Sequence, residues 1–69
     1  MATQTFEEAG FRFVAGEEYT LNGQRGREWI AQRRAVGGCC WIRLMAAHMP
    51  LRATRKEIVN EFDTLGLFD

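Results

Sequence analysis

The chain has 69 residues, of which 46% are hydrophobic and 12% aromatic, so its composition excludes a disordered segment and allows one small domain, residues 1–69. A domain of this size buries only about 60% of the surface of its unfolded chain, and disulfides, a metal or oligomerisation commonly supplement the core. The two cysteines, Cys39 and Cys40, are adjacent, which is too close for ordinary disulfide geometry. Oligomerisation is therefore the supplement that we expect.

The charged residues cancel to a net charge of zero, but they are strongly segregated along the chain. Residues 1–24 hold four acidic residues and one arginine, a net charge of −3. Residues 25–56 hold eight basic residues and one glutamate, a net charge of +7, and residues 57–69 hold four acidic residues and no base, a net charge of −4. Charge blocks of this kind indicate partners and association rather than a fold.

The first residues contain no basic region followed by an apolar run, so we expect no signal peptide. The longest apolar run, residues 39–49, is too short to span a bilayer, so we expect no membrane partner. Together with two free thiols, these features predict a cytoplasmic protein.

The acidic segment, residues 1–24, predicts a β-hairpin or an irregular segment. Residues 11–14 and 19–21 alternate apolar and polar side chains, and a glycine-containing loop separates them. The apolar face of this hairpin is expected to consist of Phe11, Phe13, Tyr19 and Leu21. A lone hairpin is marginally stable, so it must pack on helices.

Two helices are predicted in the middle of the chain. The first covers residues 27–36, where the residues at helical spacing are Trp29, Ile30, Arg33 and Val36. The second covers residues 39–49, which are apolar apart from Arg43 and His48, as in a helix buried on nearly every side. Two glycines separate these helices, and a proline ends the second.

A third helix is predicted over residues 55–65. Thr54 and Glu57 have the spacing of a capping box, and an apolar stripe follows them at Ile58, Val59, Phe62 and Leu65. Gly66 then stands where a left-handed cap ends a helix, and the two apolar residues after it can fold back onto the last turn.

Together these elements predict an α+β protein that is mostly helical, with a short N-terminal β-hairpin or irregular segment followed by two to three packed helices. A single chain offers too little apolar cover for both sides of residues 39–49, so we expect a homodimer. Its interface is expected to contain Trp41, Leu44, Met45 and Met49.

The sequence carries no catalytic or metal-binding pattern. It has no serine, its carboxylates lack apolar isolation, and its glycine-containing stretches do not match a phosphate-binding loop. Cys39, Cys40 and His48 are the soft metal ligands, whereas a structural zinc needs four. We therefore predict that the protein is not an enzyme and has neither a metal nor a cofactor.

The basic block predicts a binding surface. Arginine outnumbers lysine eight to one, and a guanidinium suits bidentate recognition of a carboxylate or a phosphate. The candidate partner-binding residues are Arg25, Arg27, Arg33, Arg34, Arg52, Arg55 and Lys56. The alternative is a solvated surface whose charges pair with acidic residues of the last helix in a dimer.

The stretch from Trp41 to Leu67 resembles the opening of a helix-turn-helix or winged-helix domain. In these domains an apolar helix is followed by a Thr-capped helix, which here contains Glu57-Ile58 and closes on Leu65-Gly66-Leu67. The resemblance implies contact with DNA through a further recognition helix in the major groove. The sequence contains no such helix after Leu67.

Two functions are consistent with these features. The first is a non-enzymatic, homodimeric interaction protein that binds and modulates or inhibits another protein. In size and style it is similar to the short inhibitor proteins that phages and mobile elements direct against host regulators, transcription and other machinery. The second is a small DNA- or RNA-binding regulator that uses the arginine block against phosphates. Salt dependence separates the two, because phosphate-driven affinity falls steeply as salt rises.

Overall fold

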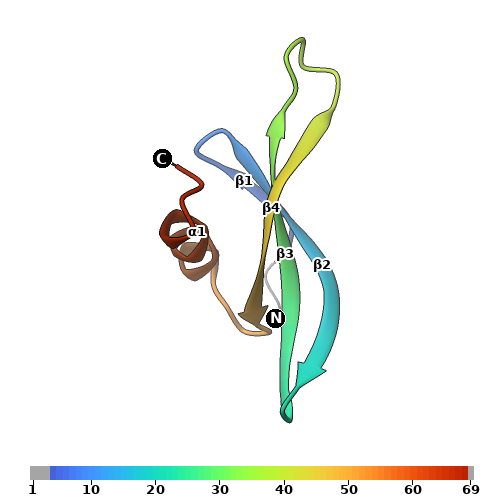
Figure 1. The fold of residues 1–69 in the computed structure, drawn as a ribbon, viewed down its shortest axis with the longest axis vertical. Coiled ribbons are helices and arrows are strands. Elements are labelled where there is room, and N and C mark those ends of the chain that lie inside the picture. Colours follow the sequence, from blue (N-terminus) through green and yellow to red (C-terminus); the bar gives the residue numbers. More distant parts are fainter. Residues whose placement is uncertain (1–3, 69) are drawn as a thin grey trace.

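The computed structural model describes residues 4–68, which form a four-stranded antiparallel β-sheet and one α-helix (Figure 1). The strands are β1 (Phe6–Glu8), β2 (Phe11–Leu21), β3 (Gln24–Arg34) and β4 (Trp41–Pro50), and the helix is α1 (Arg55–Thr64). The sheet order is β1-β2-β3-β4, so every strand pairs with its neighbour in the sequence. The prediction of a mostly helical protein is therefore wrong.

The two longest strands, β2 and β3, are joined by the two-residue turn Asn22-Gly23. Both residues have a positive φ, 52° and 79°, as a type I′ turn requires. Further along β2 the register shifts between Ala15 and Glu18, where the strand contains a bulge. The hairpin predicted within residues 11–21 is therefore wrong, because its expected loop is this bulge inside one continuous strand.

The helices predicted over residues 27–36 and 39–49 are also wrong, because these residues form most of β3 and β4. In β3, Trp29 and Ala31 are buried while the residue between them is half-buried, which is the period of two of a strand. In β4, the buried Ala47 lies opposite Trp29. Strand pairing therefore gathers the buried residues of both strands on one face of the sheet.

The third predicted helix, over residues 55–65, is confirmed as α1. The side-chain oxygen of Thr54 accepts a hydrogen bond from the backbone N–H of Glu57 (3.2 Å), and the Glu57 carboxylate accepts one from the backbone N–H of Thr54 (3.0 Å). These two bonds complete the predicted capping box and satisfy N–H groups at the start of the helix.

The left-handed cap predicted at Gly66 is confirmed as well. Gly66 has a φ of 96°, and its N–H donates to the carbonyl of Asp63 (3.1 Å). The N–H of Leu67 donates to the carbonyl of Phe62 (2.9 Å), so the chain reverses and the Leu67 side chain is buried. The element before α1 is a strand, however, so the helix pair of a helix-turn-helix motif is not formed.

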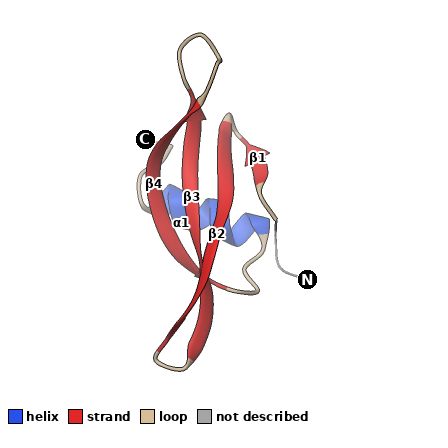
Figure 2. Ribbon diagram, turned by 90° about the vertical axis from the view of Figure 1, so that its right-hand side faces the viewer, coloured by secondary structure: helices blue, strands red, loops and turns tan. Residues whose placement is uncertain are grey.

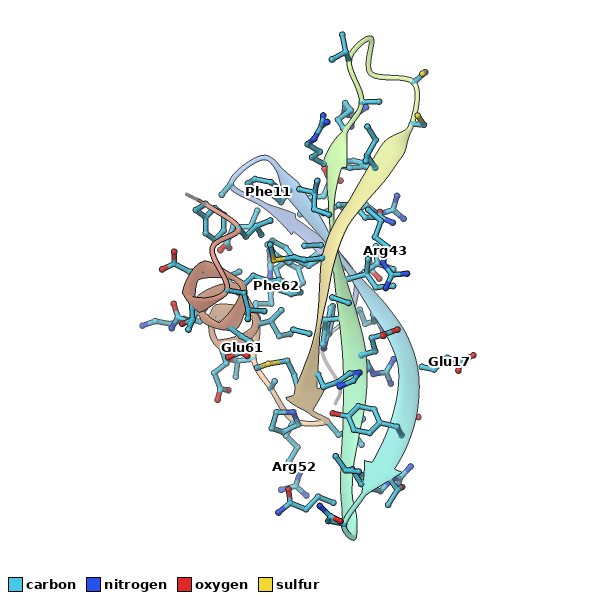
Figure 3. The ribbon with its side chains drawn as sticks, in the orientation of Figure 1. Phe11, Glu17, Arg43, Arg52, Glu61 and Phe62 are labelled. Carbon is cyan, nitrogen blue, oxygen red and sulfur yellow. The ribbon has the colours of Figure 1, made fainter. Side chains whose placement is uncertain are left out.

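The core lies between α1 and one face of the sheet. The ring of Phe13 in β2 lies 5.1 Å from that of Phe6 in β1 and 5.3 Å from that of Phe62 in α1, measured between ring centroids. Figure 3 shows Phe11 and Phe62 on the side of the sheet that faces the helix. The large side chains that are almost fully buried here are Trp29, Phe13, Phe62 and Ile58.

The helix covers only one face of the sheet, and Figure 2 shows the sheet from the opposite side, with α1 behind the strands. The molecule is elongated, 43 × 22 × 19 Å, and the strands run along its long axis (Figure 1). The β2–β3 turn lies at one end of this axis and the β3–β4 loop at the other (Figure 1). Within residues 4–68, no helix has the length and apolar character needed to cross a membrane.

Candidate interaction surface

The sheet face opposite α1, which we call the open face, has an apolar row across its middle. Phe13 and Trp29 point toward the helix, so their strand neighbours Val14 and Ile30 point the other way. The register places Val14 beside Ile30 and Ile30 beside Ala46 of β4. All three side chains are half-buried, and within the described residues no helix covers them.

The end of the open face nearer the β3–β4 loop carries one tryptophan and three arginines, two of which lie near its ring. The Arg34 guanidinium lies 4.7 Å from the centre of the Trp41 ring, and the Arg12 guanidinium lies 5.6 Å from it. Arg43 follows Trp41 by two residues in β4, and Figure 3 shows its side chain pointing away from α1. We call Arg12, Arg34, Trp41 and Arg43 the arginine–tryptophan cluster.

The arginines of this cluster have no acidic partner among residues 4–68. The ion pairs in this part of the chain join Glu18 to Arg25 and Arg27 and join Glu28 to His48. Arg34 does donate one hydrogen bond, from Nη1 to the carbonyl oxygen of Gly38 (3.3 Å). The cluster thus carries net positive charge on an accessible surface, and no ion pair within residues 4–68 compensates it.

The other end of the open face is acidic. His48 lies with its Nε2 atom 3.8 Å from Oε2 of Glu28, and its ring centroid is 4.8 Å from that of Tyr19. These three residues and Glu17 line a shallow pocket. Figure 3 shows Glu17 pointing away from the helix, on the same side of the sheet as Arg43. The open face is therefore positive at one end, apolar in the middle and negative at the other end.

The structure distributes the seven predicted partner-binding residues over several surfaces. Arg25 and Arg27 form ion pairs with Glu18. Arg33 and Arg34 are consecutive in β3, so strand alternation directs them to opposite faces. The remaining three lie in the β4–α1 loop and the first turn of the helix: Arg52, Arg55 and Lys56.

Two arginines of the cluster, Arg12 and Arg43, were missed by the sequence analysis. Each is a cross-strand neighbour of Gln32, so pairing of β2 and β4 with β3 brings them to the same level of the sheet. The signal that could have found them is the period of two, which places Arg43 on the same face as Trp41 and Arg12 on the same face as Val14.

The four predicted dimer residues do not share one face. Trp41 lies in the arginine–tryptophan cluster, whereas Met49 is buried in the core and Met45 packs against it. Leu44 is the extra residue where the β3–β4 register shifts, and it is exposed. A dimer built on all four would have to open the core.

The soft metal ligands named in the sequence analysis also lie apart. Cys39 and Cys40 are exposed in the β3–β4 loop, with their sulfur atoms 3.9 Å apart. His48 lies near the other end of β4, beside Tyr19. Among residues 4–68, no three His, Cys, Asp or Glu side chains are grouped so that they could hold a metal ion.

Comparison with known proteins identifies no relative: no family matches the chain, and no curated protein or solved structure is significantly similar to it.

Proposed function

We propose that the protein is a small, non-enzymatic interaction protein that binds an acidic surface of another protein and thereby modulates or inhibits it. The observation that carries the proposal is the arginine–tryptophan cluster, in which the guanidinium groups of Arg12 and Arg34 lie near one half-buried indole ring, Arg43 lies two residues further along the same strand, and none of the three arginines has an ion-pair partner among residues 4–68. Folding alone gives no reason to concentrate unpaired positive charge at one place on a sheet.

The chemistry of the cluster favours a protein partner. Guanidinium groups bind carboxylates through paired hydrogen bonds, and tryptophan and arginine are enriched among the residues that contribute most to protein–protein binding. Trp41 would supply apolar contact area, with Arg34 of the adjacent β3 and Arg12 of β2 near its ring and Arg43 two residues away in β4. A partner held in this way loses access to its other ligands, so binding alone, without catalysis, would be enough to inhibit it.

We place this action in the cytoplasm. Cys39 and Cys40 are both exposed as free thiols, a state that persists in a reducing compartment and is readily lost in an oxidising one.

A second candidate function is binding of single-stranded nucleic acid, and one observation favours it. An open antiparallel sheet that presents an indole ring next to guanidinium groups resembles a stacking platform for bases with phosphate contacts beside it. The acidic end of the same face, with Glu17 and Glu28, would confine such a strand to a few nucleotides. Direct DNA readout by a recognition helix is not part of this candidate, because the described helix packs on the core.

Two defined probes separate the candidates: an oligoglutamate peptide and a single-stranded oligonucleotide of equal charge. The fluorescence of Trp41 reports binding, and the variant Trp41→Phe removes the signal while leaving Trp29, which is 2% exposed, in place. Contact with three phosphates predicts that log K falls against log salt with a slope of about −2. Peptide binding without oligonucleotide binding supports the protein candidate, and the reverse result supports the nucleic-acid candidate.

Capture from a cell extract then tests the proposal with natural partners. The double variant Arg12→Glu/Arg43→Glu should weaken binding of the captured protein by at least about 10-fold, which corresponds to about 1.4 kcal/mol. The matched control is Arg52→Glu/Arg55→Glu, which reverses two charges on the helix side and should bind normally. Equal binding by both double variants would overturn the assignment of the cluster as the binding surface.

A further inference from the structure

The two ends of the open face are complementary to one another. At one level of the sheet the cross-strand neighbours are Arg12, Gln32 and Arg43, and beside them Arg34 contacts Trp41. Glu7 in β1 is the cross-strand neighbour of Arg12. It forms no ion pair with Arg12, but its nearby negative charge offsets part of the positive charge at this end. At the other end lie the carboxylates of Glu17 and Glu28.

From this arrangement we propose that a second copy of the chain packs face to face on the open face, about a two-fold axis that crosses the strands near Ile30. The axis could in principle run along the strands or across them. Along the strands, it would bring positive end to positive end and negative end to negative end, which is unfavourable. Across the strands, it brings the positive end of each copy to the negative end of the other, so the charges select this orientation.

The strand register gives the position of the axis. Ile30 lies two residues from Gln32 in one direction along β3 and two residues from Glu28 in the other, or about 7 Å each way. A two-fold axis at Ile30 therefore places the Arg12–Gln32–Arg43 row of one copy opposite the Glu28–His48 row of the second copy. Both contacts are made twice, as a two-fold interface requires.

The middle of the face supplies the apolar contact. The row formed by Val14, Ile30 and Ala46 is half-buried within one chain and would meet the same row of the second copy. Stacked sheets pack about 10 Å apart, with side chains of this size between them. The face of a molecule that measures 43 × 22 × 19 Å has an outline of several hundred Å², comparable with the ~800 Å² that each partner contributes to a standard interface.

This dimer also has a consequence for the binding surface, and this consequence alone rests on the proposed function. The carboxylates of the second copy occupy the position of the acidic partner, so the dimer covers the arginine–tryptophan cluster. The partner and the second copy then compete for one surface, and self-association regulates how much of the protein is free to bind.

Sedimentation of the intact chain, from about 1 µM to about 500 µM, tests the dimer. The average mass of a reversible dimer rises with protein concentration, whereas the mass of a monomer stays constant. We expect a reversible dimer. Two double variants, Arg12→Glu/Arg43→Glu and Glu17→Lys/Glu28→Lys, should each raise the dissociation constant at least about 10-fold, since each makes the two ends of the face alike. The matched control, Arg52→Glu/Arg55→Glu, should dimerise as the original chain does.

Mixing the two double variants gives the most specific result. One carries a mostly acidic open face, on which Arg34 remains, and the other carries a mostly basic one, on which Glu7 remains. Together they should therefore form a 1:1 heterodimer although neither dimerises alone. Circular dichroism of each variant checks that the fold is retained. A third variant, Ile30→Glu, places two like charges at the axis and should also give a monomer.

Three results would overturn the proposal: a wild-type monomer throughout this range, folded double variants that still dimerise, or a mixture that stays monomeric. Failure of the dimer is distinguishable from failure of the proposed function. Glu17→Lys/Glu28→Lys leaves the cluster intact, so it should bind an acidic probe at least as well as the original chain. Loss of the dimer without probe binding contradicts the proposed function alone, and probe binding by a wild-type monomer contradicts the dimer alone.

Discussion

The two tryptophans of this protein stand on opposite faces of one sheet and have different surroundings. Trp29 is 2% exposed and lies among phenylalanines beneath α1, with its ring centroid 5.8 Å from that of Phe6. Trp41 is half-buried on the open face and has two guanidinium groups near its ring. The same residue type therefore contributes to stability on one face and is available for binding on the other.

Adjacent residues of one strand can serve these two roles, core stability and surface binding. Phe13 is fully buried in the core, whereas Arg12 and Val14, its neighbours in sequence, lie on the open face. A register shift of one residue would move the core side chains of a strand to the open face. The register that buries the core therefore also determines which side chains stand on the open face. The following predictions test how strict this division is.

The largest effect is expected on the covered face. Phe13→Ala should lower the free energy of unfolding by about 3–5 kcal/mol, because it removes a fully buried ring that contacts both β1 and α1. The matched control is Val14→Ala on the open face, which should cost less than about 1.5 kcal/mol because this side chain is only half-buried. Urea denaturation measures both, and equal losses would contradict the division between the faces.

A smaller loss is expected for Gly26→Ala, at the acidic end of the open face. A methyl group at Gly26 would lie 2.7 Å from the hydroxyl of Tyr19 and 2.8 Å from the carbonyl oxygen of Met49, both too close for contact. We expect a destabilisation of about 1–3 kcal/mol from this overpacking. Adding Tyr19→Ala should recover part of it, because only the carbonyl contact then remains. A Gly26→Ala variant with an unchanged urea midpoint would contradict this expectation, because both the Tyr19 ring and the Met49 carbonyl would then have to move aside freely.

The helix that covers one face depends on its N-cap. Thr54→Ala should cost about 1 kcal/mol, because the side-chain oxygen that accepts from the N–H of Glu57 is lost. Thr54→Ser keeps this oxygen and should stay close to the original stability. Urea midpoints of the two variants provide the measurement, and equal midpoints would contradict the role of the cap.

A related but smaller effect is expected with pH. A hydrogen bond with the backbone N–H of Thr54 is the main cause that lowers the pKa of Glu57 below its ordinary value of 4.5, and a hydrogen bond with the Thr54 side chain contributes less. The folded state therefore favours the carboxylate, so its contribution is fully present above about pH 4.5 and is lost as the pH falls below that value. Thermal unfolding from pH 7 to about pH 3 should show a steeper decline for the original chain than for Glu57→Gln. Equal declines for the two proteins would indicate that the pKa of Glu57 is the same in the folded and unfolded states.

The smallest effect on stability is expected within the arginine–tryptophan cluster. Arg43→Ala should change the free energy of unfolding by less than about 0.5 kcal/mol, because its side chain is exposed and has no ion-pair partner among residues 4–68. Binding of an acidic probe should nevertheless weaken. A large loss of stability would mean that the cluster serves folding, and the division between the two faces would fail.

The helix and its two ends were predictable because their signals are local. Thr54 and Glu57 are three residues apart, and Gly66 directly follows the last turn, so propensity and capping act within one short segment. The alternation at residues 11–14 and 19–21 did indicate strand, and both segments lie in β2, but β3 and β4 were predicted as helices because their apolar residues fit two periods. Trp29 and Ile30 fit a helical stripe as well as a strand, and only pairing with β2 and β4 decides between them.

The sequence does contain one local signal of the sheet, the dipeptide Asn22-Gly23. Asn22-Gly23 between alternating segments is the strongest short-range indication of a β-hairpin, and it marks the β2–β3 turn. Taken as a hairpin turn, it predicts that residues 11–21 and 24–34 form one pair of antiparallel strands, as β2 and β3 do. The arginine–tryptophan cluster lay beyond local reasoning, because Arg12 and Trp41 are 29 positions apart and meet only through strands paired side by side.

The order of the strands also bears on how fast the chain can fold. Every strand pairs with the next one along the chain, and the β2–β3 connection has only two residues. A hairpin can close at Asn22-Gly23 within about 1–10 µs and extend by adding pairs outward from the turn. β1 and β4 then add to edges that already exist, without a crossover or a long loop to close. Nucleation at one turn and growth to both sides should make this sheet a fast folder among β-rich proteins of its length.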